Sequence, residues 1–121
     1  MSEIEVGEYI RTNDGIIGKL KRIELDNIDK SLKWYVFSGK IPDKNIIDEV
    51  YINKPYIIKH SKNIIDLIEL YDYVNYFPVF DIIAYNDGRK EIRLSNGNIL
   101  GNKNIETIWT KEQLKTIEYN I

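Results

Sequence analysis

Two residue types that carry much of protein chemistry are scarce in this sequence of 121 residues, which has no cysteine and a single histidine, His60. Without cysteine the chain can form no disulfide, thiolate nucleophile, iron–sulfur centre or cysteine-ligated zinc site. A Ser-His-Asp triad would depend on His60 alone. Long apolar runs are also lacking, since the stretch FPVF at residues 77–80 is far too short to cross a bilayer.

A strong excess of charge of either sign is absent too, because 17 basic and 19 acidic residues leave a net charge of −2. Such a balance gives no global attraction to nucleic acid or to an anionic membrane. The segment from Met1 to Glu5 is acidic and lacks the basic and apolar regions of a secretory signal. We therefore expect a protein of the cytoplasm with no membrane partner.

Isoleucine dominates what is present, with 23 residues, whereas alanine occurs once, at Ala84. Isoleucine, valine and threonine together make 32 of the 121 residues, and β-branched side chains favour strands over helices. Alanine, the best helix former, is nearly missing. The chain is therefore predicted to be mainly β. The abundance of Ile, Lys, Asn and Tyr also indicates an AT-rich genome, which is typical of phages and of many bacterial chromosomes.

Strand and turn signals follow one another along the chain and predict short antiparallel strands. We expect strands near residues 5–12, 16–25, 33–37, 50–52, 68–75, 78–85, 90–94, 98–100 and 116–119. Turns that tolerate positive φ separate several of them, at Asn13-Asp14-Gly15, Asn86-Asp87-Gly88 and Ser95-Asn96-Gly97. Single helical turns are expected after Ser61, as N-cap, and after Thr110, which has capping-box spacing with Gln113.

A sequence repeat suggests that the chain consists of two similar halves. Residues 4–10, IEVGEYI, match residues 68–74, IELYDYV, at an offset of 64, and only Gly7 against Tyr71 is dissimilar. Each copy is followed by a hydrophobic strand and later by an Asn/Asp-Gly turn, which favours duplication of one small β unit. We expect an SH3-like half at 1–60 and another at 61–121. Each half would be a small antiparallel β-barrel of about five short strands, and the two would pack together.

Three features resemble catalytic or ligand-binding motifs but lack essential parts. His60 has no recognisable orienting carboxylate or nucleophile beside it, so we interpret it as structural or solvated. The acidic residues of the first half fit no EF-hand spacing. The stretch GIIGK at residues 15–19 lacks the four-residue gap and the following Ser or Thr of a phosphate loop. We therefore expect no catalytic residue, no metal and no cofactor.

Aromatic and basic residues intermingle in the first third of the chain. On single-strand-binding barrels, bases stack on such rings while lysines follow the phosphates. This alternative nucleic-acid surface would comprise Arg11, Lys19, Lys21, Arg22, Trp34 and Tyr35. In the competing interpretation Trp34 and Tyr35 are core residues, one on each face of a strand, and the cations form a solvated face. The acidic balance of the whole chain favours the competing interpretation.

The densest aromatic stretch lies at residues 71–80. Strand alternation would put Tyr71 and Tyr73 on one face and Asp72 and Val74 on the other. Tyrosines in such a stretch either belong to a core or anchor a protein contact, because Tyr is enriched among interface hot spots. Exposure of several of them together would favour the contact surface.

Three segments carry a resemblance to known proteins: VGEYIRTNDGIIGK at 6–19, IKHSKNIIDLIE at 58–69, and the tail at 110–119. They resemble small SH3-like proteins from phages and prophages of AT-rich bacteria. The likeness touches the beginning, middle and end of the chain. It implies an SH3-like fold but no catalytic residues, since this group is mostly uncharacterised. Tyr71 departs from the Gly-Asp pair expected before the second barrel.

Small, acidic, cysteine-free proteins of mobile elements often resemble anti-defence factors, including anti-CRISPR inhibitors. The resemblance predicts a non-enzymatic protein-binding module of phage origin that blocks a host protein, a CRISPR-associated nuclease, by protein–protein contact. Acidic side chains would imitate the charge of nucleic acid and tyrosines would anchor the contact. The predicted contact residues are Asp26, Asp29, Asp43, Asp48, Glu49, Tyr51, Tyr71, Tyr73 and Tyr76. The alternatives are an SH3-like nucleic-acid-binding protein or a phage accessory protein with another role.

Overall fold

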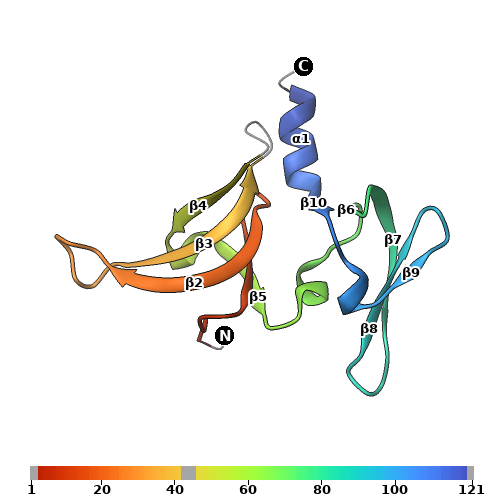
Figure 1. Cartoon of the computed structure of the whole chain (residues 1–121), viewed down its shortest axis with the longest axis horizontal. Helices are drawn as coiled ribbons and strands as arrows, with labels where there is room; N and C mark the ends of the chain where they lie inside the picture. Colours follow the sequence, from red (N-terminus) through yellow and green to blue (C-terminus); the bar gives the residue numbers. More distant parts are fainter. Residues whose placement is uncertain (1–2, 42–45, 120–121) are drawn as a thin grey trace. The chain divides into compact units, whose positions relative to one another are not determined.

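Two antiparallel sheets make up most of the protein, which is mainly β, as its composition predicts (Figure 1). The structure is a computed structural model that describes residues 3–41 and 46–119. Within these residues there are two five-stranded sheets, one α-helix and three short 3-10 turns. The chain divides into two compact units, Met1–Lys62 and Asn63–Ile121, and each unit contains one sheet.

The first sheet is a four-strand meander whose first strand also pairs with a fifth. The strands are β1 (Tyr9–Thr12), β2 (Ile17–Leu25), β3 (Lys33–Ile41), β4 (Ile46–Ile52) and β5 (Ile57–Ser61). Their spatial order is β4-β3-β2-β1-β5, and all pairs are antiparallel. The 3-10 turn η1 (Lys54–Tyr56) precedes β5 and has Pro55 in its first turn, where the missing N–H is not needed.

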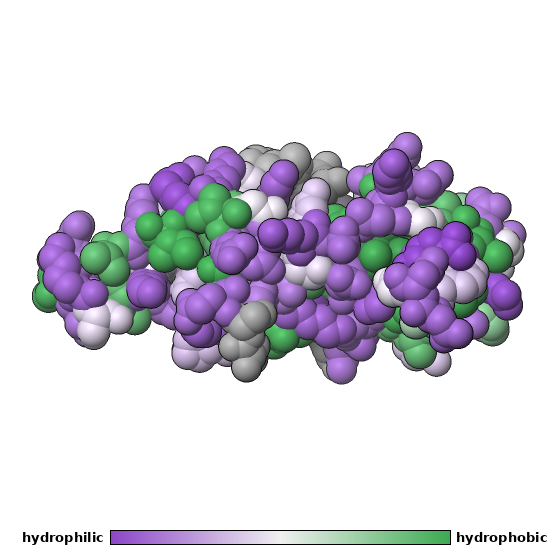
Figure 2. Space-filling model, turned by 90° about the horizontal axis from the view of Figure 1, so that it is seen from below, coloured by the Kyte–Doolittle hydropathy of each residue, from purple (hydrophilic) through white to green (hydrophobic). Residues whose placement is uncertain are grey.

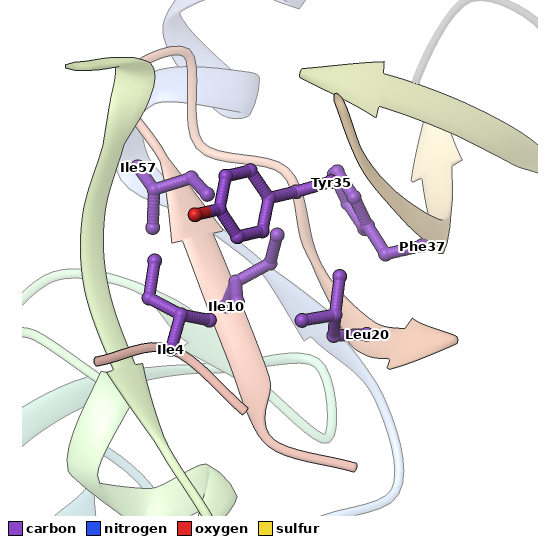
Figure 3. Packing of buried hydrophobic residues seen from close by; sticks show 6 residues of the cluster. All are labelled: Ile4, Ile10, Leu20, Tyr35, Phe37 and Ile57. Carbon is purple, nitrogen blue, oxygen red and sulfur yellow. The ribbon is translucent and has the colours of Figure 1, made fainter. Parts of the chain in front are cut away.

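Side chains from the first sheet, together with Ile4 before β1, form the hydrophobic core of the first unit. Figure 3 shows these side chains directed toward one another: Ile4, Ile10, Leu20, Tyr35, Phe37 and Ile57. The strands approach closely where Gly18 pairs with Gly39 across β2 and β3. A Cβ on Gly18 would lie 2.0 Å from the carbonyl oxygen of Ser38 and 2.5 Å from the Phe37 ring, so only glycine fits there. The packing of Phe37 thus depends on a missing side chain in the neighbouring strand.

The second sheet is built from shorter strands. They are β6 (Tyr73–Val74), β7 (Phe77–Ala84), β8 (Lys90–Leu94), β9 (Ile99–Leu100) and β10 (Ile108–Trp109), in the spatial order β10-β6-β7-β8-β9. The 3-10 turn η2 (Ile64–Leu67) comes before the sheet, and η3 (Asn102–Asn104) follows β9. The core of this unit consists of Ile65, Ile68, Val74, Val79, Ile92 and Leu94.

The last described element corrects one strand prediction. Helix α1 (Lys111–Tyr119) occupies the residues expected to form a strand at 116–119, so that prediction is wrong. The capping box at its start is confirmed, because the Gln113 N–H donates to Thr110 Oγ1 (3.3 Å) and Gln113 Oε1 accepts from the Thr110 N–H (3.1 Å). The β-branched Thr116 and Ile117 favour a strand locally, but a capped first turn starts a helix that continues through them.

Two further predictions differ from the structure in detail. The strand expected at 68–75 is confined to β6, because a turn with left-handed φ at Tyr71 comes before it. The helical turn expected after Ser61 is η2, whose N-cap is Asn63 and whose conformation is 3-10.

The two sheets have the same connectivity. In each, four strands form a meander, a 3-10 turn follows the fourth, and the fifth strand pairs with the first. The matching heptapeptides occupy corresponding places, since Tyr9 begins β1 and Tyr73 begins β6, 64 residues later. In the described residues β4 does not pair with β5, nor β9 with β10, so each sheet is open at its edge strands.

Candidate functional site

A turn leads into the first strand of each sheet, and it is built the same way in both units. Gly7 has a φ of 97°, and Tyr71, at the corresponding place, has a φ of 73°. In each unit the carboxylate of the next residue, Glu8 or Asp72, accepts a hydrogen bond of 2.8 Å from the backbone N–H three residues earlier. Both carboxylate residues are buried. The turn therefore requires a left-handed residue at Tyr71 as firmly as at Gly7.

The carboxylate of Glu8 also binds the single histidine. His60 Nδ1 lies 2.8 Å from Glu8 Oε2, and both side chains are less than one-tenth exposed. Burial raises the pKa of Glu8, but the hydrogen bonds to His60 and to the Glu5 N–H lower it more, so its pKa lies below the usual value. The pair connects the start of β1 to β5. His60 thus has a structural role, and its carboxylate partner is 52 residues away in sequence.

Two aromatic side chains and a proline form a row on the outer face of the second sheet. Tyr73 lies opposite Trp109 of β10 on one side and opposite Pro78 of β7 on the other. Residues that pair across strands share a face. Val74, the next residue of β6, is fully buried in the core. Because successive residues of a strand point to opposite faces, the row lies on the face away from this core.

Two more exposed aromatic residues border this row. Tyr71 is 70% exposed, and its N–H donates to the carbonyl of Val79 (3.0 Å), which fixes the turn beside β7. Phe80 is 71% exposed and is the extra residue of a bulge, because the pairing of β7 with β8 shifts register between Val79 and Asp81. We call the following five residues the aromatic face: Tyr71, Tyr73, Pro78, Phe80 and Trp109.

Four of the five equivalent positions in the first unit carry different side chains; the five are Gly7, Tyr9, Lys19, Lys21 and Ser61. Tyr9 pairs with Ser61 and with Lys19, and the register shift of β2 leaves Lys21 as the bulge residue. The ammonium group of Lys19 lies 5.9 Å from the centre of the Tyr9 ring. The first unit thus has the same backbone with one tyrosine, two lysines and two small residues at these positions. The fold itself therefore does not require the aromatic face.

Three non-glycine residues of the second unit have left-handed backbone conformations: Tyr71, Asn75 and Tyr76, with φ of 73°, 49° and 74°. Asn75 and Tyr76 connect β6 to β7 in a two-residue turn, which ordinarily has the sequence Asn-Gly. Asn75 is held in place because its Oδ1 accepts from the N–H groups of Glu106 (2.8 Å) and Thr107 (3.1 Å). The two tyrosines, by contrast, are about 70% exposed, and left-handed φ costs an ordinary residue ~1–2 kcal/mol.

The tyrosines predicted as partner contacts are all exposed. Tyr51 lies on β4 of the first unit, whereas Tyr71, Tyr73 and Tyr76 lie on the second. Figure 2 shows hydrophobic residues, in green, interrupting the hydrophilic surface of both units. The joint exposure of Tyr71, Tyr73 and Tyr76 favours a contact surface over a core for this stretch.

The carboxylates predicted to contact a partner hold their own loop together. Asp26 accepts hydrogen bonds from the N–H of Asp29 (2.9 Å), from Trp34 Nε1–H (3.0 Å) and from the N–H of Ile28 (3.0 Å), and these bonds lower its pKa. Asp29 in turn accepts from the Ser31 hydroxyl (2.6 Å) and N–H (3.0 Å), which lower the pKa of Asp29. Both acids therefore stabilise the turn between β2 and β3.

The remaining acids predicted to contact a partner are Asp43, Asp48 and Glu49. Asp43 lies outside the described residues. Asp48 lies on β4, where its backbone pairs with Gly39 of β3. Glu49 accepts a hydrogen bond from Arg22 Nη1 (3.1 Å), and this contact lowers the pKa of Glu49. The charge of Glu49 is thus partly balanced within the chain.

Two residues of the alternative nucleic-acid surface are buried, which corrects that prediction. Arg11 is fully buried, and Tyr35 belongs to the first core. Neither can reach a phosphate or a base. Arg22 binds Glu24, with 2.6 Å between Nε and Oε1. The members that reach the surface are Lys19, Lys21, Arg22 and Trp34.

A pocket lies beside the last 3-10 turn of each sheet. The pocket of the second unit has a volume of about 390 Å³ and includes η3, Lys90 and Asp66, and the last two form an ion pair of 3.1 Å. The pocket of the first unit has about 220 Å³ and includes Lys54 and Pro55 of η1. Among residues 3–41 and 46–119 no three His, Cys, Asp or Glu side chains gather as metal ligands. None of the described helices has the length and apolarity needed to cross a membrane.

Comparisons with protein-family models, with curated proteins and with solved structures found no match. The surfaces are therefore interpreted from their own residues. Sequence reasoning missed Pro78 and Trp109 as members of the aromatic face. Trp109 follows Ile108 in a two-residue strand that is too short to give an alternating pattern. The repeat does not locate it either, because the equivalent residues Ser61 and Trp109 are 48 positions apart, whereas the heptapeptides are 64 apart.

Proposed function

We propose that this protein is a non-enzymatic protein-binding module of two SH3-like units, and that the aromatic face of the second unit is its contact surface. Five short antiparallel strands in each unit, with the fifth beside the first, support the SH3-like part of the proposal. The exposed aromatic rings support the binding part, because Tyr and Trp dominate the energetics of protein interfaces.

The backbone strain at Tyr71 carries the proposal. The corresponding turn of the first unit has Gly7, which adopts positive φ without strain. A tyrosine there costs stability, and a side chain that is 70% exposed regains little of it by burial. The same holds for Tyr76 in the turn between β6 and β7. Two strained, solvent-facing tyrosines within one short segment indicate side chains that are kept for recognition.

The chemistry of the aromatic face favours a protein partner over nucleic acid. Binding of single strands combines stacking rings with lysines or arginines that follow the phosphates. None of the five residues of the aromatic face is charged. In the first unit Lys19 and Lys21 occupy the equivalent places, but only Tyr9 accompanies them. Neither unit therefore combines several rings with cations at these five positions, as a single-strand-binding surface would require.

The partner we propose is a host defence protein, a CRISPR-associated nuclease, blocked by contact and without chemistry. The AT-rich composition and the resemblance to phage proteins support this choice of partner. The acidic side chains take a smaller part than the sequence suggests, because Asp26 and Asp29 serve their own turn. The aromatic rings therefore supply the main contact.

Phage plating on a host with an active CRISPR nuclease tests the proposal. The wild-type protein should raise the plating of a targeted phage. The double variant Y71G/F80K gives the second unit the residues that the first unit has at these places, so it should lose the effect while staying folded. Lys21→Ala, at the bulge of the first sheet, is the matched control and should act like wild type.

Three results would overturn the proposal. An unchanged effect of Y71G/F80K would remove the aromatic face as the contact, and no rescue by the wild-type protein would exclude the nuclease as the partner. Binding of single-stranded DNA that weakens steeply between two salt concentrations would favour the nucleic-acid alternative.

A further inference from the structure

A separate pocket lies on the first unit, near the end of β2. Its volume is about 290 Å³, and it is lined by Glu24, Leu25, Asp26, Asn27, Trp34 and Tyr51. These residues come from β2, the turn after it, β3 and β4. The pocket therefore brings together Asp26 and Tyr51, predicted as protein contacts, with Trp34, predicted to contact nucleic acid.

The aromatic walls of this pocket are fixed by hydrogen bonds. Trp34 Nε1–H donates to Asp26 Oδ1 (3.0 Å), and Glu24 pairs with Trp34 across β2 and β3. On β4, the Tyr51 hydroxyl accepts from Arg22 Nη2 (3.0 Å). Rings held in this way lose little freedom when a ligand binds, which favours affinity.

The charge of the pocket suits a cation. Two of its six lining residues carry carboxylates, Glu24 and Asp26, and none is basic. Arg22 binds Glu24 through Oε1 (2.6 Å), and its guanidinium lies 6.0 Å from the centre of the Tyr51 ring. A cation of the chain itself thus already lies near this ring. Cations are attracted to the faces of Trp and Tyr rings, and carboxylates add to the attraction.

We propose that this pocket binds the cationic end of a lysine or arginine side chain on the protein partner. The two rings would contact the apolar stem and the charged end, and the carboxylates would balance its charge. The inference deepens the proposed function and rests on its protein partner. The pocket shares no residue with the aromatic face, and its binding of a cation can be tested without the partner. A failed test of the pocket therefore does not decide whether the aromatic face is a contact surface, and a failed test of the aromatic face does not decide whether the pocket binds a cation.

Titration of the ¹⁵N-labelled protein with small probes tests the pocket directly. The probes are N-acetyl-lysine methylamide, N-acetyl-arginine methylamide and the neutral N-acetyl-norleucine methylamide, at matched ionic strength. The readout is the indole N–H signal of Trp34, with that of Trp109 as an internal reference. We expect saturable shifts of the Trp34 signal with a cationic probe and none with norleucine. The lysine and arginine arms identify which cation the pocket prefers.

Variants separate the contribution of each wall. Glu24→Gln should weaken binding of the preferred cationic probe about three- to fivefold, the size of an exposed cation–π or charge contact. Glu106→Gln removes the same charge from the other unit and should have no effect. Tyr51→Phe keeps the ring and should bind, whereas Tyr51→Leu should bind more weakly. Equal shifts with norleucine, no saturation with either cation, or unchanged binding by Glu24→Gln would overturn the proposal.

Discussion

Replacement of Tyr71 by glycine should stabilise the second unit. Left-handed φ costs an ordinary residue ~1–2 kcal/mol, and Tyr71 has a φ of 73°. Glycine removes this cost but loses ~0.5–1 kcal/mol more conformational entropy on folding. The N–H that donates to the Val79 carbonyl (3.0 Å) remains. The side chain is 70% exposed, so little buried area is lost. We expect a net gain of ~0.5–1 kcal/mol.

The first unit supplies the reverse experiment. Gly7 has a φ of 97°, and a Cβ placed there meets no atom within 4 Å, so Gly7→Ala adds backbone strain without a clash. It should destabilise the first unit by ~0.5–1 kcal/mol, the left-handed cost less the entropy that alanine saves.

Urea unfolding followed by tryptophan fluorescence measures both changes, because Trp34 reports on the first unit and Trp109 on the second. With a typical slope of ~1–2 kcal/mol/M, the midpoints should move by about 0.5 M, upward for Tyr71→Gly and downward for Gly7→Ala. A lower urea midpoint for Tyr71→Gly, or an unchanged midpoint for Gly7→Ala, would refute the argument that left-handed φ at this turn costs stability.

Four other substitutions test the roles assigned to buried residues. Glu8→Ala leaves His60 and the Glu5 N–H without their buried acceptor and should cost ~1–3 kcal/mol in urea unfolding, whereas His60→Ala should leave binding intact. Folding lowers the pKa of Glu8. Its carboxylate therefore stabilises the folded state above its unfolded pKa of about 4.3, and this stabilisation is lost as the pH falls through the lower folded pKa. Glu8→Gln should flatten this part of the plot of unfolding free energy against pH. Gly18→Ala should destabilise the first sheet by at least ~1–3 kcal/mol, measured by the thermal midpoint, because the new Cβ would overlap the Ser38 carbonyl oxygen.

Local signals in the sequence account for most of the fold. The Asx-Gly turn at residues 13–15 and the β-branched residues predict the first two strands, because both act over a few residues. The capping box predicts the start of α1, whereas its length escaped prediction because β-branched Thr116 and Ile117 favour a strand. Intrinsic propensity is a weak predictor that structural context routinely overrides.

The candidate site was less predictable. The sequence left open whether Tyr71 and Tyr73 are core residues or exposed ones, because alternation of side chains along a strand does not show which face is buried. The aromatic face needs Trp109 beside Tyr73, and that pairing joins residues 36 positions apart. The sequence also did not reveal that the carboxylate of Asp26 accepts hydrogen bonds from its own turn and from Trp34. Such contacts follow from the tertiary fold and leave no local pattern.

The central claim is that the second unit keeps strained tyrosines for recognition at the expense of stability. The most direct test compares three proteins: wild type, Tyr71→Gly and Lys21→Ala. Phage rescue is measured in cells that produce each protein, and the urea midpoint is measured on the same protein after purification. We predict that Tyr71→Gly is more stable than wild type and rescues less, while Lys21→Ala rescues fully. Full rescue by a stabilised Tyr71→Gly protein would contradict the account.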